Sequence, residues 1–270
     1  MIESSFCFLP GVGIRTERRF WHEGLITWER FLRACAFPGI SLARKARLDE
    51  DIREAQEHFA RADSRYFAHI LPSRHQWRLY EWLRAQALYL DIETNSFGEI
   101  TLVGLYGRGA YTALIRGETL DGRRLADELS QYELLVTFCG SIFDLPMLVT
   151  HFPNLPLNQP HIDLCAVGRQ LGYRGGLKAI ERRMGIERSP ELQGFTGADA
   201  VRQWNRWRHR RDEGARELLV AYNKADCVNL EPLADAFYCQ LAQSTGLHEA
   251  LVRFGMSTRE LLPNRAHSLG

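Results

Sequence analysis

The chain has 270 residues, of which 45% are hydrophobic and 25% are charged, and its formal net charge is +1. This is ordinary globular composition, and the near-zero charge means that any nucleic-acid surface must be a local patch. The six cysteines form no Cys-x-x-Cys pair, which argues against a zinc site or a disulfide scaffold. The N-terminus lacks signal-peptide features, and no apolar run approaches the roughly 20 residues that span a bilayer. We therefore expect a cytoplasmic protein without membrane contact, and the sequence carries no indication of its oligomeric state.

The first 83 residues are expected to be helical and rich in arginine and aromatic side chains. A Pro10-Gly11-Val12-Gly13 turn precedes a helix over 14–22, and a second helical run covers 27–34. Such a turn lets the backbone approach a phosphate, and the helix N-terminus behind it offers free N–H donors. The pattern resembles a helix-hairpin-helix, but a small helical packing unit with a glycine turn explains it equally well. The candidate nucleic-acid contacts of this region are Gly11, Gly13 and Arg15.

From residue 87 the sequence takes on strand character. Three runs with short gaps predict antiparallel hairpins, and ELLVTF at 133–138 is typical of a strand covered on both faces. A helix is expected over 121–131, and the chain is expected to be helical from the last strand to about residue 240. This order predicts a mixed α/β sheet with helices around it. The expected strands are Ala87–Ile92, Glu99–Tyr106, Ala110–Ile115, Glu133–Phe138 and His161–Leu164.

Two carboxylates, Asp91 and Glu93, are expected at the end of the first strand. Residues i and i+2 of a strand point to the same face, so these two side chains project together. Like charges held this close raise each other's pKa unless a cation lies between them. By itself the pair is equally consistent with a solvated strand end and with half of a divalent-metal site.

Two later elements carry further carboxylates. Asp144 is expected in the first turn of a helix that follows the fourth strand, and Asp226 on a helix that begins near Gly214. Tyr222 lies four residues before Asp226 and therefore on the same helix face. Since ligands of open α/β sheets bind beyond the carboxyl ends of the strands, the three elements are expected to converge there.

These motifs together resemble a known family. Asp-x-Glu on the first strand, Phe-x-Gly-x-x-Phe-Asp-x-Pro after the fourth and Tyr-x-x-x-Asp on a late helix are similar to the three motifs of DEDD-type 3′–5′ exonucleases. These belong to the ribonuclease H-like superfamily. Tyr222 places the resemblance in the DEDDy branch, closest to bacterial ribonuclease H-like exonuclease-domain proteins. One departure is Cys139, where the second motif usually has asparagine to steady the turn or to contact substrate.

The resemblance implies a ribonuclease H-like five-stranded mixed sheet flanked by helices, behind an N-terminal helical, helix-hairpin-helix-like segment. The implied domains are 1–83 for that segment, 84–240 for the exonuclease domain and 241–270 for a C-terminal helix and tail. The implied activity is metal-dependent 3′–5′ exonuclease hydrolysis of DNA or RNA with a single-stranded 3′ end. The alternatives are a structure-specific endonuclease of the same fold and a non-catalytic nucleic-acid-binding module.

The resemblance also implies roles for the site residues, with two divalent ions, Mg²⁺ or Mn²⁺, as cofactors. Asp91 would bridge both metals, with Glu93 and Asp226 completing the water-activating site and Asp144 holding the second metal. Tyr222 would orient the attacking water.

Other polar residues are expected to support the site or to contact nucleic acid. The stretch 202–211 is basic with two tryptophans, and we favour an amphipathic helix with Trp204 and Trp207 packed inward. Asn223 and Asn229 flank the third motif and are expected, at most, to support the residues that hold the metal, whereas His161 and Asp163 are expected to be structural or to give similar support rather than to be ligands. The candidate phosphate contacts in this part of the chain are Lys178, Arg206 and Arg210.

Overall fold

A computed structural model describes residues 1–256; the C-terminal tail that the sequence predicts extends into residues 257–270, which lie outside the described residues. The chain divides by its contacts into two units. One unit combines residues 1–84 with those from 238 onward, and the other covers residues 85–237 and contains the sheet. No helix among the described residues is long and apolar enough to cross a membrane.

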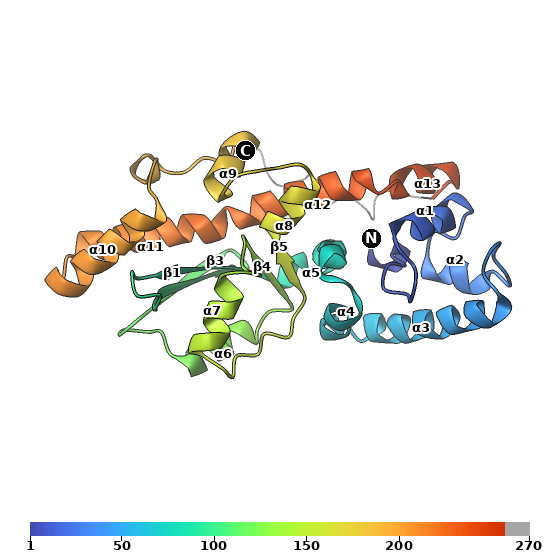
Figure 1. Cartoon of the computed structure of the whole chain (residues 1–270), viewed down its shortest axis with the longest axis horizontal. Helices are drawn as coiled ribbons and strands as arrows, with labels where there is room; N and C mark the ends of the chain where they lie inside the picture. The colour runs from blue at the N-terminus through green and yellow to red at the C-terminus, as the bar shows by residue number, and fades with distance from the viewer. Residues whose placement is uncertain (257–270) are drawn as a thin grey trace. The chain divides into compact units, whose positions relative to one another are not determined.

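The sheet has five strands in the order β3-β2-β1-β4-β5 (Figure 1). The first three pair antiparallel as successive hairpins, whereas β4 and β5 run parallel to β1. This is the mixed five-stranded sheet flanked by helices that the sequence predicts. The strands are β1 (Ala87–Thr94), β2 (Ile100–Gly107), β3 (Ala110–Ile115), β4 (Leu134–Thr137) and β5 (His161–Asp163).

Strand β1 is longer than the sequence predicts. It pairs with β2 as far as Thr94, whereas β4 follows it only as far as Tyr89. The expected end at Ile92 is therefore wrong, because hairpin pairing on one side continues the strand beyond its parallel neighbour. Asp91 and Glu93 lie inside β1 but past the carboxyl end of β4.

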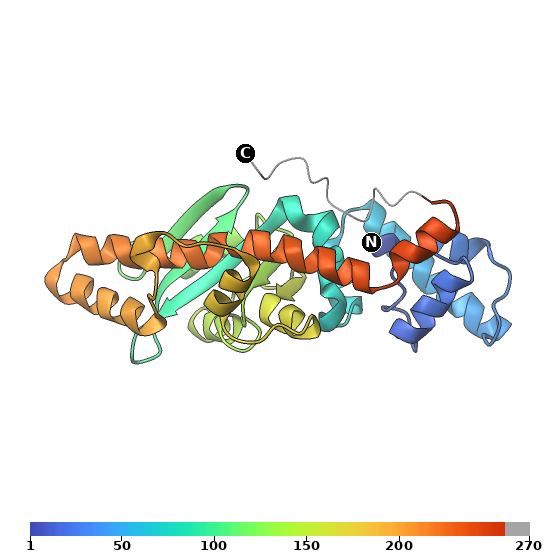
Figure 2. The ribbon, with the colours of Figure 1, turned by 90° about the horizontal axis from the view of Figure 1, so that it is seen from above.

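The two faces of the sheet are covered by different helices (Figures 1 and 2). Leu88, Leu90 and Ile92 pack with α6 (Gly122–Leu129) and α7 (Asp144–His151) in one apolar core. Leu102 and Ile115 pack in a second core with α10 (Gly197–Arg210) and α11 (Glu213–Val228). Trp204 and Trp207 of α10 are buried in this second core, so the inward packing favoured from the sequence is confirmed.

Three further helices lie wholly or partly in the sheet-containing unit. Helices α8 (Leu164–Gln170) and α9 (Leu177–Met184) follow β5, and α9 ends at Gly185 in the left-handed conformation. Helix α12 (Leu230–Ser244) follows α11 after Asn229, and the boundary between the two units falls within it.

The other unit is helical and has an aromatic core. Phe20 lies with its ring centroid 5.0–5.4 Å from those of Phe6, Phe31 and Phe37. In the same unit Glu17, which is fully buried, accepts a 2.8 Å hydrogen bond from Arg78 Nη2. Its α-helices are α1 (Ile14–His22), α2 (Trp28–Arg33), α3 (Leu42–Ala60), α4 (Ser64–Ile70), α5 (Tyr80–Leu83) and α13 (Leu247–Arg253).

Candidate metal centre and its cleft

The side chains of Asp91 and Glu93 point to one face of the sheet because side chains alternate between the two faces along β1. Leu90 and Ile92 face α6 and α7, so the residues that alternate with them face α11. On this face β2 presents Gly104, which lies opposite Asp91 in the pairing register. Two carboxylates therefore project into the space between the sheet and α11.

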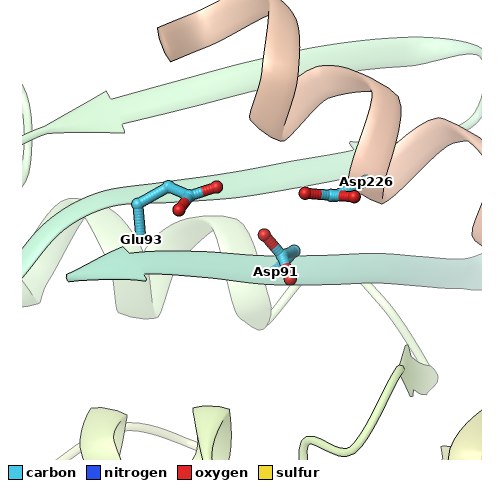
Figure 3. Close-up of side chains that lie close together, drawn as sticks. All are labelled: Asp91, Glu93 and Asp226. Carbon is cyan, nitrogen blue, oxygen red and sulfur yellow. The ribbon is translucent and has the colours of Figure 1, made fainter. Parts of the chain in front are cut away.

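Helix α11 contributes the third carboxylate of the group. Oxygen atoms of Asp91, Glu93 and Asp226 all lie within 4.8 Å of one another, and Figure 3 shows the three carboxylates turned toward a common space. Glu93 and Asp226 are buried, and Asp91 is partly exposed. The structure thus brings together three of the four predicted metal ligands, from a strand and a helix about 130 residues apart.

Burial and mutual repulsion raise the pKa values of the group. The pKa of Glu93 rises from 4.5 to about 8, first because its carboxyl is buried and then because it faces the charge of Asp226. The pKa of Asp91 lies well above 3.8, from burial and from the charges of Asp226 and Glu93. Burial also raises the pKa of Asp226, against the lowering effect of Arg188. Without a divalent cation the group therefore retains protons near neutral pH.

The donor set fits a hard divalent cation. All three side chains of the group offer carboxylate oxygen, the ligand that Mg²⁺ and Mn²⁺ prefer, and none offers nitrogen or sulfur. A bound cation would also stabilise the ionised form of carboxylates that otherwise repel each other. The residues and their raised pKa values together match a site for such an ion.

Asn223 holds two of these carboxylates from α11. Its Nδ2 donates to Asp91 Oδ2 at 2.8 Å and, at a longer 3.5 Å, to Glu93 Oε1. The orientation of the amide is set by Tyr111 of β3, whose hydroxyl donates to Asn223 Oδ1 at 2.8 Å. Space for it comes from Gly104, where an added Cβ would lie 1.7 Å from Asn223 Oδ1. Asn223 thus supports Asp91 and Glu93 of β1, not Asp226 of its own helix.

Asp144, the fourth predicted ligand, begins α7 and lies beside the three-carboxylate group. Its Oδ1 accepts a hydrogen bond from Ile92 N at 3.1 Å, and burial raises its pKa to about 7. The turn before it is held by Asp163, which accepts hydrogen bonds from the N–H groups of Cys139 (2.8 Å) and Ser141 (3.1 Å). Asp163 is thus structural, as expected.

Cys139 has a φ of +64° in this turn. Asparagine enters that region more readily than most residues, which gives a backbone reason for the asparagine expected here.

Two cations partner the third motif. Lys178 of α9 donates from Nζ to Tyr222 Oη at 2.7 Å. Arg188 donates from Nη2 to Asp226 Oδ1 at 2.5 Å, and its side chain is only 7% exposed. Glu181 fixes Arg188 by accepting from both Nε and Nη2 at 2.7 Å. Asn229 donates to the same Glu181 at 3.0 Å, so it supports the motif through that carboxylate rather than directly.

A cleft of about 1090 Å³ opens beside the carboxylates. Asp91, Tyr222 and Asp226 line it, and residues 176–196 supply much of the remaining lining, including Lys178 and Arg188. Typical ligand sites of proteins occupy roughly 300–1,000 Å³, so the space exceeds what a metal ion alone requires.

The other predicted nucleic-acid contacts are not members of this group of side chains. Arg206 and Arg210 are exposed on α10, and Arg206 donates to Asp212 Oδ2 at 2.6 Å. Gly11, Gly13 and Arg15 belong to the helical unit, where Gly13 is the N-cap of α1 and all three are exposed. Their contact with nucleic acid stays a prediction.

Sequence reasoning missed Arg188, Glu181 and Tyr111. No local motif marks any of them, because each reaches its partner only through the fold. Only a weak sequence signal exists for the ion pair of Glu181 and Arg188. The acid lies inside a predicted helix and the arginine follows seven residues later, just after the helix ends.

The central strand of this α/β sheet presents two carboxylates to a helix that carries a third, and together they offer a divalent cation a set of oxygen ligands. The chain belongs to the ribonuclease H superfamily, since the model of that superfamily matches residues 88–238, more than half of its length. Members are usually nucleases, hydrolases that act on nucleic acid and use divalent metals. No curated protein matches the sequence.

Proposed function

We propose that the chain is a metal-dependent 3′–5′ exonuclease of the DEDDy branch, which hydrolyses phosphodiester bonds of nucleic acid. The observation that carries the proposal is the group of Asp91, Glu93 and Asp226, of which Asp91 and Asp226 line one cleft together with Tyr222. A purely binding module has no physical use for buried carboxylates whose repulsion raises their pKa values. Tyr222, one helical turn before Asp226, supports the tyrosine branch.

The proposed cofactors are two divalent ions, Mg²⁺ or Mn²⁺. Asp91, Glu93 and Asp226 would hold one, and Asp144 together with Asp91 would hold the other. Such ions, when bound, activate a water and stabilise charge on the attacking and leaving oxygens of a phosphodiester. Burial and the neighbouring carboxylates raise the pKa of Tyr222 above its ordinary value, so the phenol stays protonated. Its role is then to donate a hydrogen bond that orients the attacking water, not to act as a base.

The proposed substrate is DNA or RNA with a single-stranded 3′ end. Residues 84–240 would form the nuclease domain and residues 1–83 a nucleic-acid-binding region. Cations at the cleft and along α10 suit the phosphate backbone, and the exposed glycines before α1 suit close approach to it. The contacts proposed on these grounds are Lys178, Arg206, Arg210, Gly11, Gly13 and Arg15.

The test is a panel of 5′-labelled single-stranded DNA and RNA oligonucleotides with free or blocked 3′ ends, incubated with Mg²⁺ or Mn²⁺. We expect a ladder shortening from free 3′ ends, no ladder from blocked ends, and none from the matched Asp91→Asn variant. Cleavage of circular single strands would favour the endonuclease instead. Binding without any cleavage would favour the non-catalytic module.

A further inference from the structure

Lys178 and Tyr222 form a contact outside the group of three carboxylates. Lys178 is the second residue of α9, and its Nζ lies 2.7 Å from Tyr222 Oη and 4.4 Å from the ring centroid. Both residues line the cleft that contains Asp91 and Asp226. The ammonium on α9 thus contacts the phenol on α11.

The chemistry of the two groups sets the direction of this hydrogen bond. An ammonium has three donors and no acceptor, so the phenol oxygen must accept. The hydroxyl proton must then point to another acceptor, and the negative charges that face Tyr222 are the carboxylates of Asp226, Glu93 and Asp91. A phenol without such a partner can either donate or accept, whereas this one can only donate toward the carboxylates or a water among them.

The ring of Tyr222 does not need Lys178 to hold its place. Its centroid lies 4.6 Å from that of Phe195, Arg188 Cζ lies 5.8 Å above the ring, and Tyr222 is buried in the core with α10. Lys178 itself is half-buried. Lys178 therefore affects the orientation of the Tyr222 hydroxyl group and not the packing of its ring.

We propose that Lys178 is a positioning residue, which fixes the Tyr222 hydroxyl as a hydrogen-bond donor toward the water that attacks the phosphodiester. The inference rests on the proposed nuclease function and adds a specific role for a cation of α9. Lys178 then acts through Tyr222, and the direct contact with the nucleic-acid backbone proposed for it above is the alternative role that the experiment must separate.

A double-mutant cycle separates the two roles. Lys178→Met should lower kcat about tenfold or more with KM unchanged within about twofold, and Tyr222→Phe should have the same effect. The double variant should lose no more than either single variant, because both remove one shared effect. Lys178→Arg, which retains a donor, should recover part of the lost kcat. A multiplicative loss in the double variant, a raised KM with normal kcat, or wild-type kinetics in Lys178→Met would overturn the proposal.

A second measurement does not depend on activity. With 3-fluorotyrosine at position 222, Lys178→Met should shift the ¹⁹F resonance more than Lys224→Met, which removes an exposed cation of α11, and Lys178→Arg should move it back. Equal shifts in the Lys178→Met and Lys224→Met proteins would overturn the contact. If the wild-type protein is inactive but shows the expected shifts, the proposed nuclease function is refuted and the hydrogen bond between Lys178 and Tyr222 is not.

Discussion

Replacing Glu93 by glutamine is expected to stabilise the metal-free protein. Glu93 is 7% exposed and its pKa is raised from 4.5 to about 8. A carboxyl whose pKa is higher in the folded state binds more protons there, so stability falls as the pH rises from about 4.5 to about 8. Glutamine, which is neutral and of similar shape, removes this cost.

The magnitude follows from the size of the shift. At pH 7 the cost removed is about 3 kcal/mol, and at pH 5 it is about 1 kcal/mol, at about 1.4 kcal/mol for each pKa unit. For a chain of this size, 3 kcal/mol corresponds to a rise in Tm of about 6–12 °C. Glutamine retains a carbonyl oxygen that can accept the long, 3.5 Å hydrogen bond from Asn223 Nδ2, so the substitution offsets little of this gain.

The assay is thermal unfolding in EDTA at pH 5 and pH 7, followed by addition of Mn²⁺. At pH 7 the Tm of the wild-type protein should rise when Mn²⁺ is added. The Glu93→Gln protein should have the higher Tm in EDTA and a smaller rise in Tm with Mn²⁺. Glu99→Gln is the matched control, since Glu99 is an exposed acid at the start of the neighbouring strand. A Glu93→Gln protein no more stable than wild type at pH 7, or equally stabilised at both pH values, would refute the electrostatic reasoning.

Three further predictions concern the frame around the carboxylates. Gly104→Ala should weaken Mn²⁺ binding measured by calorimetry and lower the free energy of unfolding in chemical denaturation by about 2 kcal/mol. The reason is that the added Cβ would lie 1.7 Å from Asn223 Oδ1, and an unchanged Mn²⁺ affinity would contradict it. Arg188→Met should cost about 3 kcal/mol or more by leaving the buried Glu181 unpaired, and adding Glu181→Gln should restore much of the loss; a double variant less stable than the single one would argue against the pairing. Apparent Mn²⁺ affinity should rise from pH 6 to about 8 as Glu93 loses its proton, with proton release on binding, and a pH-independent affinity would contradict the raised pKa.

The sequence by itself determined much of the fold and the position of the acidic residues. A two-residue period in β1 puts Asp91 and Glu93 on one face, and a four-residue spacing in α11 puts Tyr222 and Asp226 on another. These are local consequences of backbone geometry, so they can be read without knowledge of the fold. The end of β1 was predicted wrongly, because hairpin pairing with β2 carries it to Thr94.

Only the tertiary structure decided how these carboxylates are held. Asn223 reaches Asp91 across 132 positions of the chain, and Tyr111 orients Asn223 across 112. Lys178 and Arg188 reach the third motif across 44 and 38 positions. No spacing rule marks such pairs, because hydrogen bonds between distant segments depend on how strands and helices pack. The acidic residues of the site can therefore be recognised from short sequence motifs. The amide, hydroxyl and cationic side chains that hold and neutralise them are brought there only by the fold.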